Sequence, residues 1–376
     1  MVGAFGGTYE GRRVLVTGHT GFKGGWLSLW LRDLGAKVYG FSLPPADGST
    51  FFSILPGETF AKSWLEDLRT GGALRAAVSE CKPDIIFHLA AQPIVGRSYR
   101  EPIDTFTTNA LGTALLLEAV RETGTPSAVV VITSDKCYRN DNTGRPFRED
   151  DPMGGSDVYS MSKAATELVV TSWHASFFSK SAALGPLATG RAGNVIGGGD
   201  YAEDRIVPDS VRAFHQQHPL VLRRPQATRP WQHVFESASG YLALGQRLLS
   251  DTDRATLINC NFGPNPDCER TVQELVDGFL AEWPGAFPVE VALTEVYHEA
   301  SRLNLDISRA NELLGWRPAW DFQRTVAETA RWYRTRHEKA ASDHAMLEFS
   351  REQIAAYTQS AAQLGLPWVQ TGSKRQ

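Results

Sequence analysis

Cysteine and long apolar runs are both scarce in this chain. Its 376 residues include only four cysteines, which are scattered without a Cys-x-x-Cys spacing, and its histidines do not cluster. We therefore expect reduced thiols in a cytoplasmic protein, with no disulfide framework and no metal site. No apolar run reaches the roughly 18 residues that a membrane span requires. The N-terminal residues also lack the pattern of a secretory signal.

An excess of charge is absent as well. The formal net charge is −4, and charged residues make up 21% of the chain against 42% hydrophobic residues. Nucleic-acid binding would require a basic patch, and intrinsic disorder would require fewer apolar residues. The composition therefore predicts a globular protein of one large or two modest domains, with no nucleic-acid partner and no membrane partner.

The first half of the chain alternates apolar runs with helical patterns. Helical spacing is present over residues 24–34, 74–80 and 105–121. The apolar runs that predict strands are at residues 13–18, 38–41, 84–89 and 128–133. Strands that are apolar throughout and separated by helices are typical of a parallel sheet covered on both faces. The predicted fold class is therefore α/β, a Rossmann-type doubly wound parallel sheet.

The composition changes after about residue 181, where glycine, proline and arginine become frequent. A later apolar run at residues 256–262 predicts a strand that returns to the first sheet. We expect a Rossmann domain over residues 1–188, with a returning segment near 234–264. Residues 189–233 and 265–376 are expected to form a smaller, interleaved substrate domain.

A glycine-rich loop follows the first predicted strand. Residues 17–24 read Thr-Gly-His-Thr-Gly-Phe-Lys-Gly, a Gly-x-x-Gly-x-x-Gly spacing that leads into a predicted helix. This context favours a dinucleotide site, because backbone and helix amides must approach a pyrophosphate closely; the alternative is a simple tight turn. The second strand ends in residues 41–45 without an acid or an arginine, so this loop does not choose between NAD and NADP.

Tyr159 and Lys163 are four residues apart at the start of a helical stretch. That spacing places both side chains on one helix face. An adjacent ammonium and the positive ring of an oxidised nicotinamide would be needed to make a phenol a base at neutral pH. The pair is therefore a candidate for hydride chemistry, against the alternative of an exposed tyrosine and a solvated lysine.

Polar residues also close the strand at residues 128–133. Ser134, Asp135 and Lys136 offer a hydroxyl, an acid and a base at the edge where doubly wound sheets bind ligands; the alternative is a strand-end turn with solvated charges. Asn109 is a poor helix former within the helical stretch 105–121. It either kinks that helix and holds water near Lys163 or is an exposed polar residue.

Several motifs together resemble the extended short-chain dehydrogenase/reductase family, and within it the CDP-glucose 4,6-dehydratases. The resemblance runs from about Arg13 to Tyr333. It rests on the segments GHTGFKGGWLSLWL, HLAAQPIV, TSDKCY, YSMSKAATELV, RAGNVIGGGD and RPWQHV. Two positions depart from the family pattern: Val158 stands where proline is usual, and Gly96 where arginine is usual, with Arg97 next to it.

The resemblance implies an internal redox cycle on a nucleotide sugar with NAD as the cofactor. Tyr159, ionised by Lys163, would take the proton of the sugar O4 while Ser134 orients that hydroxyl. Lys136 would then remove the proton on carbon 5, and Asp135 would protonate the departing hydroxyl of carbon 6. The net reaction would turn CDP-D-glucose into CDP-4-dehydro-6-deoxy-D-glucose, a precursor of deoxysugars in cell-surface glycans such as the lipopolysaccharide O-antigen.

The resemblance also implies the binding residues. Arginines concentrate around RAGNVIGGGD and RPWQHV, and guanidinium groups suit a diphosphate. The implied substrate contacts are Gln92, Ser134, Asn194, Arg205, Arg229 and, for the nucleoside, Glu299. The implied cofactor contacts are Gly18, Thr20, Gly21, Phe22, Lys23, Gly24, Asp67, Leu68, Leu89, Ala90, Ala91, Asn109, Tyr159 and Lys163.

Other functions remain open at this stage, among them another nucleotide-sugar 4,6-dehydratase of the same family. A nucleotide-sugar 4-epimerase would use Tyr159 and Lys163 but would have no use for an acid and a base at positions 135 and 136. A dinucleotide-sensing regulator would be expected to lose the Tyr-Lys pair. The family further suggests a homodimer or homotetramer assembled through the helices that carry Asn109 and Tyr159.

Overall fold

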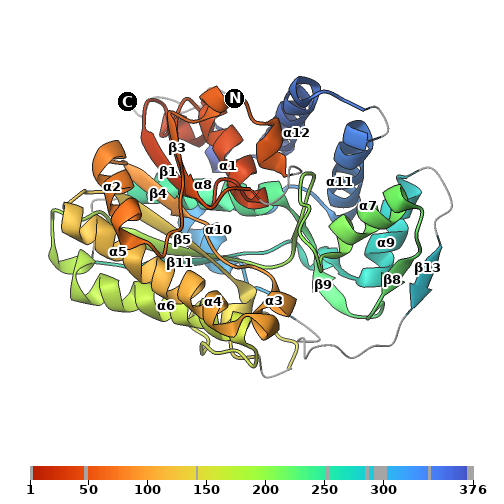
Figure 1. Cartoon of the computed structure of the whole chain (residues 1–376), viewed down its shortest axis with the longest axis horizontal. Coiled ribbons are helices and arrows are strands. Elements are labelled where there is room, and N and C mark those ends of the chain that lie inside the picture. Colours follow the sequence, from red (N-terminus) through yellow and green to blue (C-terminus); the bar gives the residue numbers. More distant parts are fainter. Residues whose placement is uncertain are drawn as a thin grey trace.

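A seven-stranded parallel sheet forms the centre of the molecule (Figure 1). The computed structural model describes residues 3–45, 50–140, 143–250, 255–283, 288–291, 303–337 and 340–370. The strand order is β11-β6-β5-β4-β1-β2-β3. The strands are β1 (Arg13–Thr17), β2 (Lys37–Ser42), β3 (Lys62–Leu65), β4 (Ile85–His88), β5 (Ala128–Ser134), β6 (Leu187–Ala192) and β11 (Ile258–Phe262).

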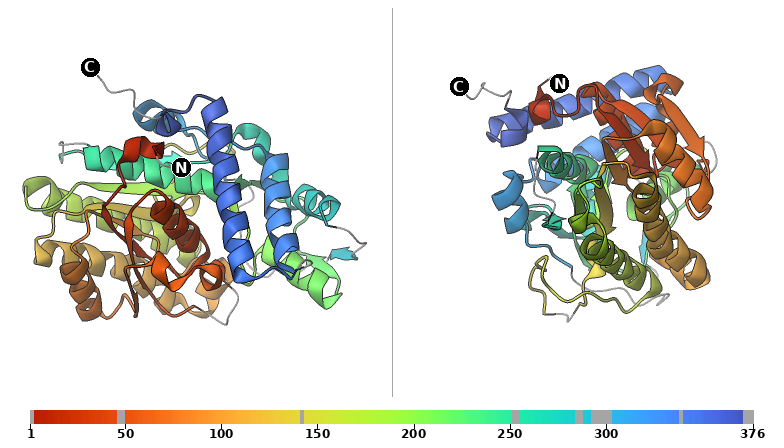
Figure 2. Two further views of the ribbon diagram at one scale, coloured as in Figure 1. Left: turned by 90° about the horizontal axis from the view of Figure 1, so that it is seen from above. Right: turned by 90° about the vertical axis from the view of Figure 1, so that its left-hand side faces the viewer.

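Helices cover both faces of this sheet. One face packs against α2 (Gly71–Cys81), α5 (Gly112–Thr123) and α6 (Val158–Ser176). The other face packs against α1 (Phe22–Asp33) and α8 (Val234–Ser250), with α10 (Ser308–Leu314), α11 (Phe322–His337) and α12 (Asp343–Gln363) on the same side. Figure 2 shows α11 and α12 side by side in blue over this side of the molecule. The predicted Rossmann class is confirmed.

Alternation along the strands explains the two layers. In β1, Val14 and Val16 belong to the core on the α1 and α8 side, whereas Leu15 belongs to the core on the α2 and α5 side. The same alternation separates Ile85 from Ile86 in β4. Each strand thus has apolar side chains on both faces, as a sheet covered on both sides requires.

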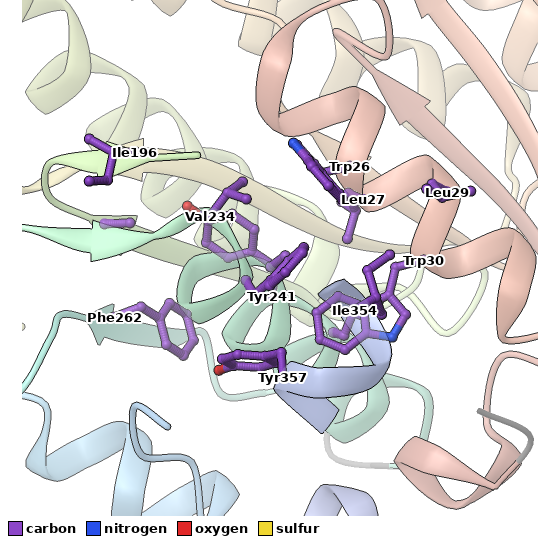
Figure 3. Close-up of a cluster of buried hydrophobic side chains, with 14 of the residues drawn as sticks. Trp26, Leu27, Leu29, Trp30, Ile196, Val234, Tyr241, Phe262, Ile354 and Tyr357 are labelled. Atoms are coloured by element: carbon purple, nitrogen blue, oxygen red, sulfur yellow. The ribbon is translucent and has the colours of Figure 1, made fainter. Parts of the chain in front are cut away.

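The C-terminal helix belongs to the same core as the first helix. Tyr357 of α12 lies edge-on to Trp30 of α1, with the ring centroids 5.9 Å apart (Figure 3). Trp368 stacks on Phe5 near the N-terminus with the centroids 4.8 Å apart. The C-terminal segment from α12 onward therefore lies against the Rossmann helices, although we expected it in the substrate domain.

A smaller region extends from the carboxyl edge of the sheet and lies at the right of Figure 1. The predicted boundary at residue 188 falls within β6, whose residues pair with β5 as far as Ala192. The returning strand is confirmed, because β11 pairs with β6. The elements of the smaller region are α7 (Ile206–Gln216), β8 (Leu220–Leu222), β9 (Thr228–Pro230), β12 (Glu269–Thr271), α9 (Val272–Ala281) and β13 (Val289–Val291).

Three short helical segments connect β4 to α5. They are α3 (Val95–Arg100), α4 (Pro102–Phe106) and a π-helical turn over Thr107–Leu111. A further short strand pair, β7 (Val195–Ile196) with β10 (Gln232–His233), follows the sheet on the substrate side. The predicted helix over residues 105–121 is therefore interrupted by one wide turn, and that turn contains Asn109.

Candidate active site

The glycine loop forms the floor of a large cavity at the carboxyl edge of the sheet. Gly18 has a φ of 77°, and a Cβ atom there would lie 2.8 Å from the backbone nitrogen of Ala90. A Cβ on Gly24 would lie 2.1 Å from the carbonyl oxygen of Gly18. Only glycine fits these two positions, so the first and third glycines of the motif have a steric cause.

The first turn of α1 faces this cavity without a side-chain cap. Gly21 is the N-cap residue, and no side chain accepts a hydrogen bond from the helix amides there. Exposed helix amides attract an anion, and a dinucleotide pyrophosphate fits a loop in which glycine permits close approach. The predicted binding loop therefore fits a dinucleotide.

The cavity has a volume of about 1260 Å³ and continues from this loop to the smaller region. Nearly all of the predicted site residues line it. Those on its wall are Gly18, Thr20, Gly21, Phe22, Lys23, Gly24, Asp67, Leu68, Leu89, Ala90, Ala91, Gln92, Ser134, Asp135, Lys136, Tyr159, Lys163, Asn194, Arg205 and Arg229. Asn109 is buried behind the wall, and Glu299 lies outside the described residues.

No acid follows β2 on the cavity wall, whereas the segment after β3 supplies the acid Asp67. The hydroxyl of Thr20 lies 2.8 Å from the Ser42 hydroxyl and donates to the carbonyl of Leu43. Asp67 accepts two hydrogen bonds from the Nε of Arg69, at 3.0 and 2.9 Å. These bonds lower the pKa of Asp67, so its carboxylate is paired at the surface of the cavity.

Tyr159 and Lys163 lie in the first two turns of α6, where the sequence places them. Asp157 caps this helix by accepting a hydrogen bond from the backbone N–H of Ser160 at 2.9 Å. Both residues are buried, with 7% and 5% of their surface exposed. Burial raises the pKa of Tyr159 to about 12 and lowers the pKa of Lys163 to about 8. In the absence of a ligand the phenol is therefore protonated at neutral pH, and a bound cation is required to ionise it.

Ser134 connects the phenol to an acid. Its side chain lowers the pKa of the Tyr159 phenol, against the larger effect of burial. Its hydroxyl donates to Oδ1 of Asp135 at 2.7 Å and accepts from the backbone N–H of Lys136 at 3.2 Å. One residue at the end of β5 therefore organises both parts of the predicted catalytic group.

Asp135 has one buried carboxylate oxygen without a hydrogen-bond partner within the described residues. The residue is 2% exposed, and the oxygen is Oδ2. A Cβ atom on Gly193, which follows the neighbouring strand β6, would lie 3.0 Å from this oxygen. A buried carboxyl oxygen without a partner is costly in a folded protein, and a substrate hydroxyl is a chemically suitable partner. Lys136 lies beside it, half-buried on the cavity wall.

Asn109 supports the wall from behind. Its side chain accepts from the backbone N–H of Gln92 at 2.8 Å and donates to the hydroxyl of Ser162 at 2.8 Å. The reading of Asn109 as an exposed polar residue is therefore wrong. Its π-helical turn joins the loop after β4 to α6, which carries Tyr159 and Lys163.

Gln92 reaches the cavity with little free hydrogen-bonding capacity. Its side-chain oxygen accepts from the backbone N–H of Ile94 at 2.5 Å, and its side-chain nitrogen donates to Thr105 at 2.8 Å. The amide thus holds its own loop, and its role as a substrate contact stays a prediction. Arg97, beside Gly96, is paired with Glu101 at 2.8 Å.

Arg191 does not belong to the predicted arginine cluster around the substrate. It is 1% exposed, and its guanidinium donates to both carboxylate oxygens of Glu167, at 2.9 and 2.8 Å. It also donates to the hydroxyl of Tyr138 at 2.7 Å. The Arg191–Glu167 ion pair joins β6 to α6, and Arg191 is not part of the cavity wall.

The smaller region supplies Asn194, Arg205 and Arg229 to the cavity wall. Arg205 precedes α7 and donates to Oδ2 of Asp200 at 2.7 Å. Sequence reasoning missed Asp200, although the signal was present: a carboxylate five residues before an arginine, at the end of a glycine run.

Comparisons with known proteins agree with this geometry. The family model described as GDP-mannose 4,6 dehydratase matches residues 15–329. The CDP-glucose 4,6-dehydratase of Salmonella typhimurium strain LT2 is 42% identical over 353 residues, which cover 93% of this chain and 97% of the relative. The chain belongs to this family of nucleotide-sugar 4,6-dehydratases.

Other members of this dehydratase family are more distant. The dTDP-glucose 4,6-dehydratase of Xanthomonas campestris pv. campestris is 26% identical over 85% of this chain and 93% of its own length. A solved dTDP-glucose 4,6-dehydratase of Bacillus anthracis, in complex with NAD, has a TM-score of 0.72 at 21% identity over 87% of this chain and 98% of its own. An epimerase of Methanothermobacter thermautotrophicus has a TM-score of 0.76 at 24% identity, over 89% and 96%. These two structures show that the fold is shared.

Family membership makes the chain an enzyme, a hydro-lyase that acts on a nucleotide sugar. The Tyr159–Lys163 pair and the acid–base pair at positions 135 and 136 line the same cavity. A regulator without catalysis would be expected to have lost these groups. No helix within the described residues is long and apolar enough to cross a membrane, and those residues contain no group of three potential metal ligands.

Proposed function

We propose that this enzyme dehydrates CDP-D-glucose to CDP-4-dehydro-6-deoxy-D-glucose with NAD as its cofactor. The observation that carries the proposal is the placement of Asp135 and Lys136 on the cavity wall, beside the Tyr159–Lys163 pair. The choice of cytidine is supported by the 42% identity to the Salmonella enzyme, since the dTDP-sugar relatives are 24–28% identical.

The first step is removal of a proton from the sugar O4. Tyr159 is the base, and its ionisation requires positive charge from Lys163 and from the cofactor ring, because burial alone raises the pKa of the phenol. Ser134, which lines the same cavity wall as Tyr159, orients the O4 hydroxyl. NAD held by the glycine loop of Gly18–Gly24 would supply a reversible hydride acceptor, which would take the hydride from carbon 4 and make it available to carbon 6.

The second step is elimination of water. A ketone at carbon 4 acidifies the hydrogen on carbon 5, and Lys136 is the base that removes this proton. Asp135 delivers a proton to the departing O6 hydroxyl from Oδ2, the oxygen that has no partner within the described structure. The atoms balance as one nucleotide sugar giving one 4-keto-6-deoxy nucleotide sugar and one water.

The diphosphate lies between the two regions in this proposal. Asn194, Arg205 and Arg229 are the groups that contact it, because they lie on the wall of the smaller region and offer amide and guanidinium donors. Glu299 stays a proposed nucleoside contact from the sequence alone.

A 4-epimerase is the competing function. An epimerase returns the hydride to carbon 4 and needs no acid at Asp135 and no base at Lys136. The test is incubation of the enzyme and NAD with CDP-, dTDP-, UDP- and GDP-hexoses in deuterated water, followed by mass spectrometry. The proposal expects loss of one water from CDP-glucose and one deuterium at carbon 5. A product of unchanged mass, or preference for another nucleotide, contradicts it.

Two variants make this test sharper. Tyr159→Phe keeps the ring and removes the base, so turnover is expected to fall by at least about a hundredfold. Phe177→Leu, an exposed residue at the far end of α6, is the matched control and is expected to keep wild-type turnover. Full activity of Tyr159→Phe contradicts the proposed first step.

We also propose that the chain assembles as a homodimer, or a homotetramer built from such dimers, in the cytoplasm. Large apolar side chains are exposed along α4, the π-helical turn and α6: Ile103 at 74%, Leu111 at 47% and Leu168 at 60%. Such a patch on adjacent helices favours contact with a second copy. Light scattering is expected to give a multiple of 41.3 kDa for the wild type and the monomer mass for Leu168→Glu with Ile103→Glu. A monomeric wild type contradicts the proposal.

A further inference from the structure

A glycine strap crosses from the sheet to the smaller region, and we define it as Gly197–Gly199. Its carbonyls are held from both sides. The indole N–H of Trp26, in α1, donates to the carbonyl of Gly198 at 2.8 Å, and the backbone N–H of Phe51 donates to that of Gly199 at 3.1 Å. The residue after the strap is Asp200, whose carbonyl accepts from the hydroxyl of Tyr333 in α11 at 2.5 Å.

Aromatic side chains pack so closely against this strap that its last two residues have no room for a Cβ atom. A Cβ atom on Gly198 would lie 2.0 Å from the ring of Trp332, and one on Gly199 would lie 2.7 Å from Phe51. Gly199 has a φ of 80°, a conformation that favours glycine. The strap therefore fixes the position of Asp200 with respect to both α1 and α11.

Asp200 is nearly buried and has two partners. Its side chain is 6% exposed. Oδ1 accepts from the backbone N–H of Ala202 at 3.1 Å, and Oδ2 accepts from Arg205 at 2.7 Å. The Arg205 side chain remains 31% exposed, so it faces the cavity while its carboxylate partner stays behind it.

Arg205 lines the same cavity as the catalytic tyrosine. Its positive charge acts on the phenol and lowers the pKa of Tyr159, against the larger effect of burial. The other groups that act on this phenol are the Ser134 side chain, the carboxylate of Asp135, and Asp157 at the start of α6. Tyr241 of α8 also lies within electrostatic range of Tyr159. Arg205 is the cation that the smaller region brings to the phenol.

Other carboxylates on the same segment could attract this guanidinium. Asp204 pairs with Arg223 at 2.9 Å, Asp209 pairs with Arg212, and Glu203 is exposed. Arg205, Arg212 and Arg223 are thus each paired with a different aspartate. Of these three aspartates, Asp200, the partner of Arg205, is the buried one. A fixed, buried partner selects one orientation for a long and flexible side chain.

We infer that Asp200 is a positioning residue: it holds the Arg205 guanidinium between the phenol oxygen of Tyr159 and the sugar-bearing phosphate of the substrate. Through Arg205, Asp200 favours substrate binding and ionisation of the base together. This inference rests on the proposed function, which places the diphosphate against Arg205.

The test compares Asp200→Asn, Arg205→Gln, the double variant and Asp204→Asn, with CDP-glucose as the substrate and NAD as the cofactor. Asparagine keeps the acceptor for the Ala202 amide and removes the charge that holds Arg205. Asp204→Asn removes the same kind of charge from an exposed ion pair of the same segment, and the positive φ of 59° at this position suits asparagine. It is the matched control.

We expect Asp200→Asn to raise KM for CDP-glucose between about tenfold and a hundredfold, as expected when a charge-assisted hydrogen bond is lost. The rise of kcat with pH that reports ionisation of Tyr159 should also move to higher pH. The reason is that the phenol is harder to ionise once Arg205 has moved away. The double variant should be no worse than Arg205→Gln alone, since one residue acts through the other. Thermal stability and NAD binding should equal the wild type, and Asp204→Asn should show none of these changes.

Several results would overturn the inference. Removal of a negative charge with Arg205 still in place would move the pH limb to lower pH, so a shift in that direction, or no shift, contradicts it. Additive losses in the double variant, or equal behaviour of Asp200→Asn and Asp204→Asn, contradict it too. If Asp200→Asn does not fold, Asp200→Glu replaces it, because glutamate keeps the charge but moves it by one methylene. An Asp200→Glu variant with the wild-type KM also contradicts the inference. A wild type that does not dehydrate CDP-glucose would instead contradict the proposed function.

Discussion

The hydroxyl of Ser134 donates a hydrogen bond to Oδ1 of Asp135 at 2.7 Å, while the same side chain lowers the pKa of the Tyr159 phenol. The base of the first step and the acid of the second are thus connected through one serine. Proton removal at O4 and proton delivery at O6 therefore depend on the same residue at the end of β5.

Ser134→Ala is expected to slow both half-reactions. Removal of a hydroxyl that orients the substrate and supports the acid should lower kcat by about 10²- to 10³-fold, with a smaller change in KM. Ser134→Thr keeps the hydroxyl and should recover most of the activity. Steady-state rates with CDP-glucose check the expectation, and an alanine variant with wild-type kcat would exclude this role for Ser134.

Asp135→Asn and Lys136→Ala are expected to stop the reaction at different points. Without Lys136, the proton on carbon 5 stays in place, so no deuterium from the solvent should appear there. Without the acid at residue 135, the hydrogen on carbon 5 can exchange but water is not lost. Both rates of dehydration should fall by about 10²- to 10⁴-fold. Mass spectrometry and proton NMR of the recovered sugar distinguish the two, and equal exchange in both variants would contradict the assigned roles.

Arg191→Met is expected to destabilise the fold by about 3–5 kcal/mol, because it leaves the Glu167 carboxylate buried without its partner. Adding Glu167→Gln should recover a large part of this loss. Lys62→Met, in the exposed ion pair with Glu80, is the control and should cost no more than about 1 kcal/mol. Urea unfolding measures all three. A loss for Arg191→Met as small as that of the control would show that the buried pair contributes little.

Glu236 gives a pH dependence of stability. Burial raises the pKa of this carboxyl from 4.5 to about 7, although Tyr357 donates to it at 2.6 Å. Between these two pKa values the folded state binds a proton that the unfolded state has lost, so stability falls as pH rises from about 4.5 to about 7 and then levels off. The difference of about 2.5 pH units corresponds to about 3 kcal/mol.

Glu236→Gln is expected to lose this slope. Unfolding free energies of the wild type and the variant, measured from pH 5 to 8, check the prediction, with the exposed Glu58→Gln as the control. A wild type and a variant whose stabilities change in parallel over this range would rule out the titration of Glu236.

The sequence predicted the strands whose residues are apolar on both sides and missed those that are not. β3 (Lys62–Leu65) lies at the edge of the sheet and is mostly exposed, so its polar residues hide the pattern. β6 contains Gly190 and Arg191, and a buried arginine in a strand can be recognised only when its partner Glu167 is seen on α6. Tertiary pairing of this kind leaves no local trace in the sequence.

The candidate site shows the same limit. The Tyr159–Lys163 spacing and the glycine loop are local patterns, and both placed their residues on the cavity wall. The opposite orientation of Arg191, the internal hydrogen bonds of Gln92 and the buried support by Asn109 depend on contacts between distant segments. Residue type alone did not distinguish a side chain that faces the cavity from one that supports its wall.

The strap that Trp26 holds has a thermodynamic consequence. Its helix begins at the glycine loop, the proposed cofactor site, and the strap leads directly to Asp200 and Arg205, on the side proposed to bind the sugar nucleotide. If one ligand changes the affinity for the other through the placement of this helix, the second ligand changes the affinity for the first by the same factor. The strap would then link the two halves of the cavity, although no residue of the strap needs to contact either molecule.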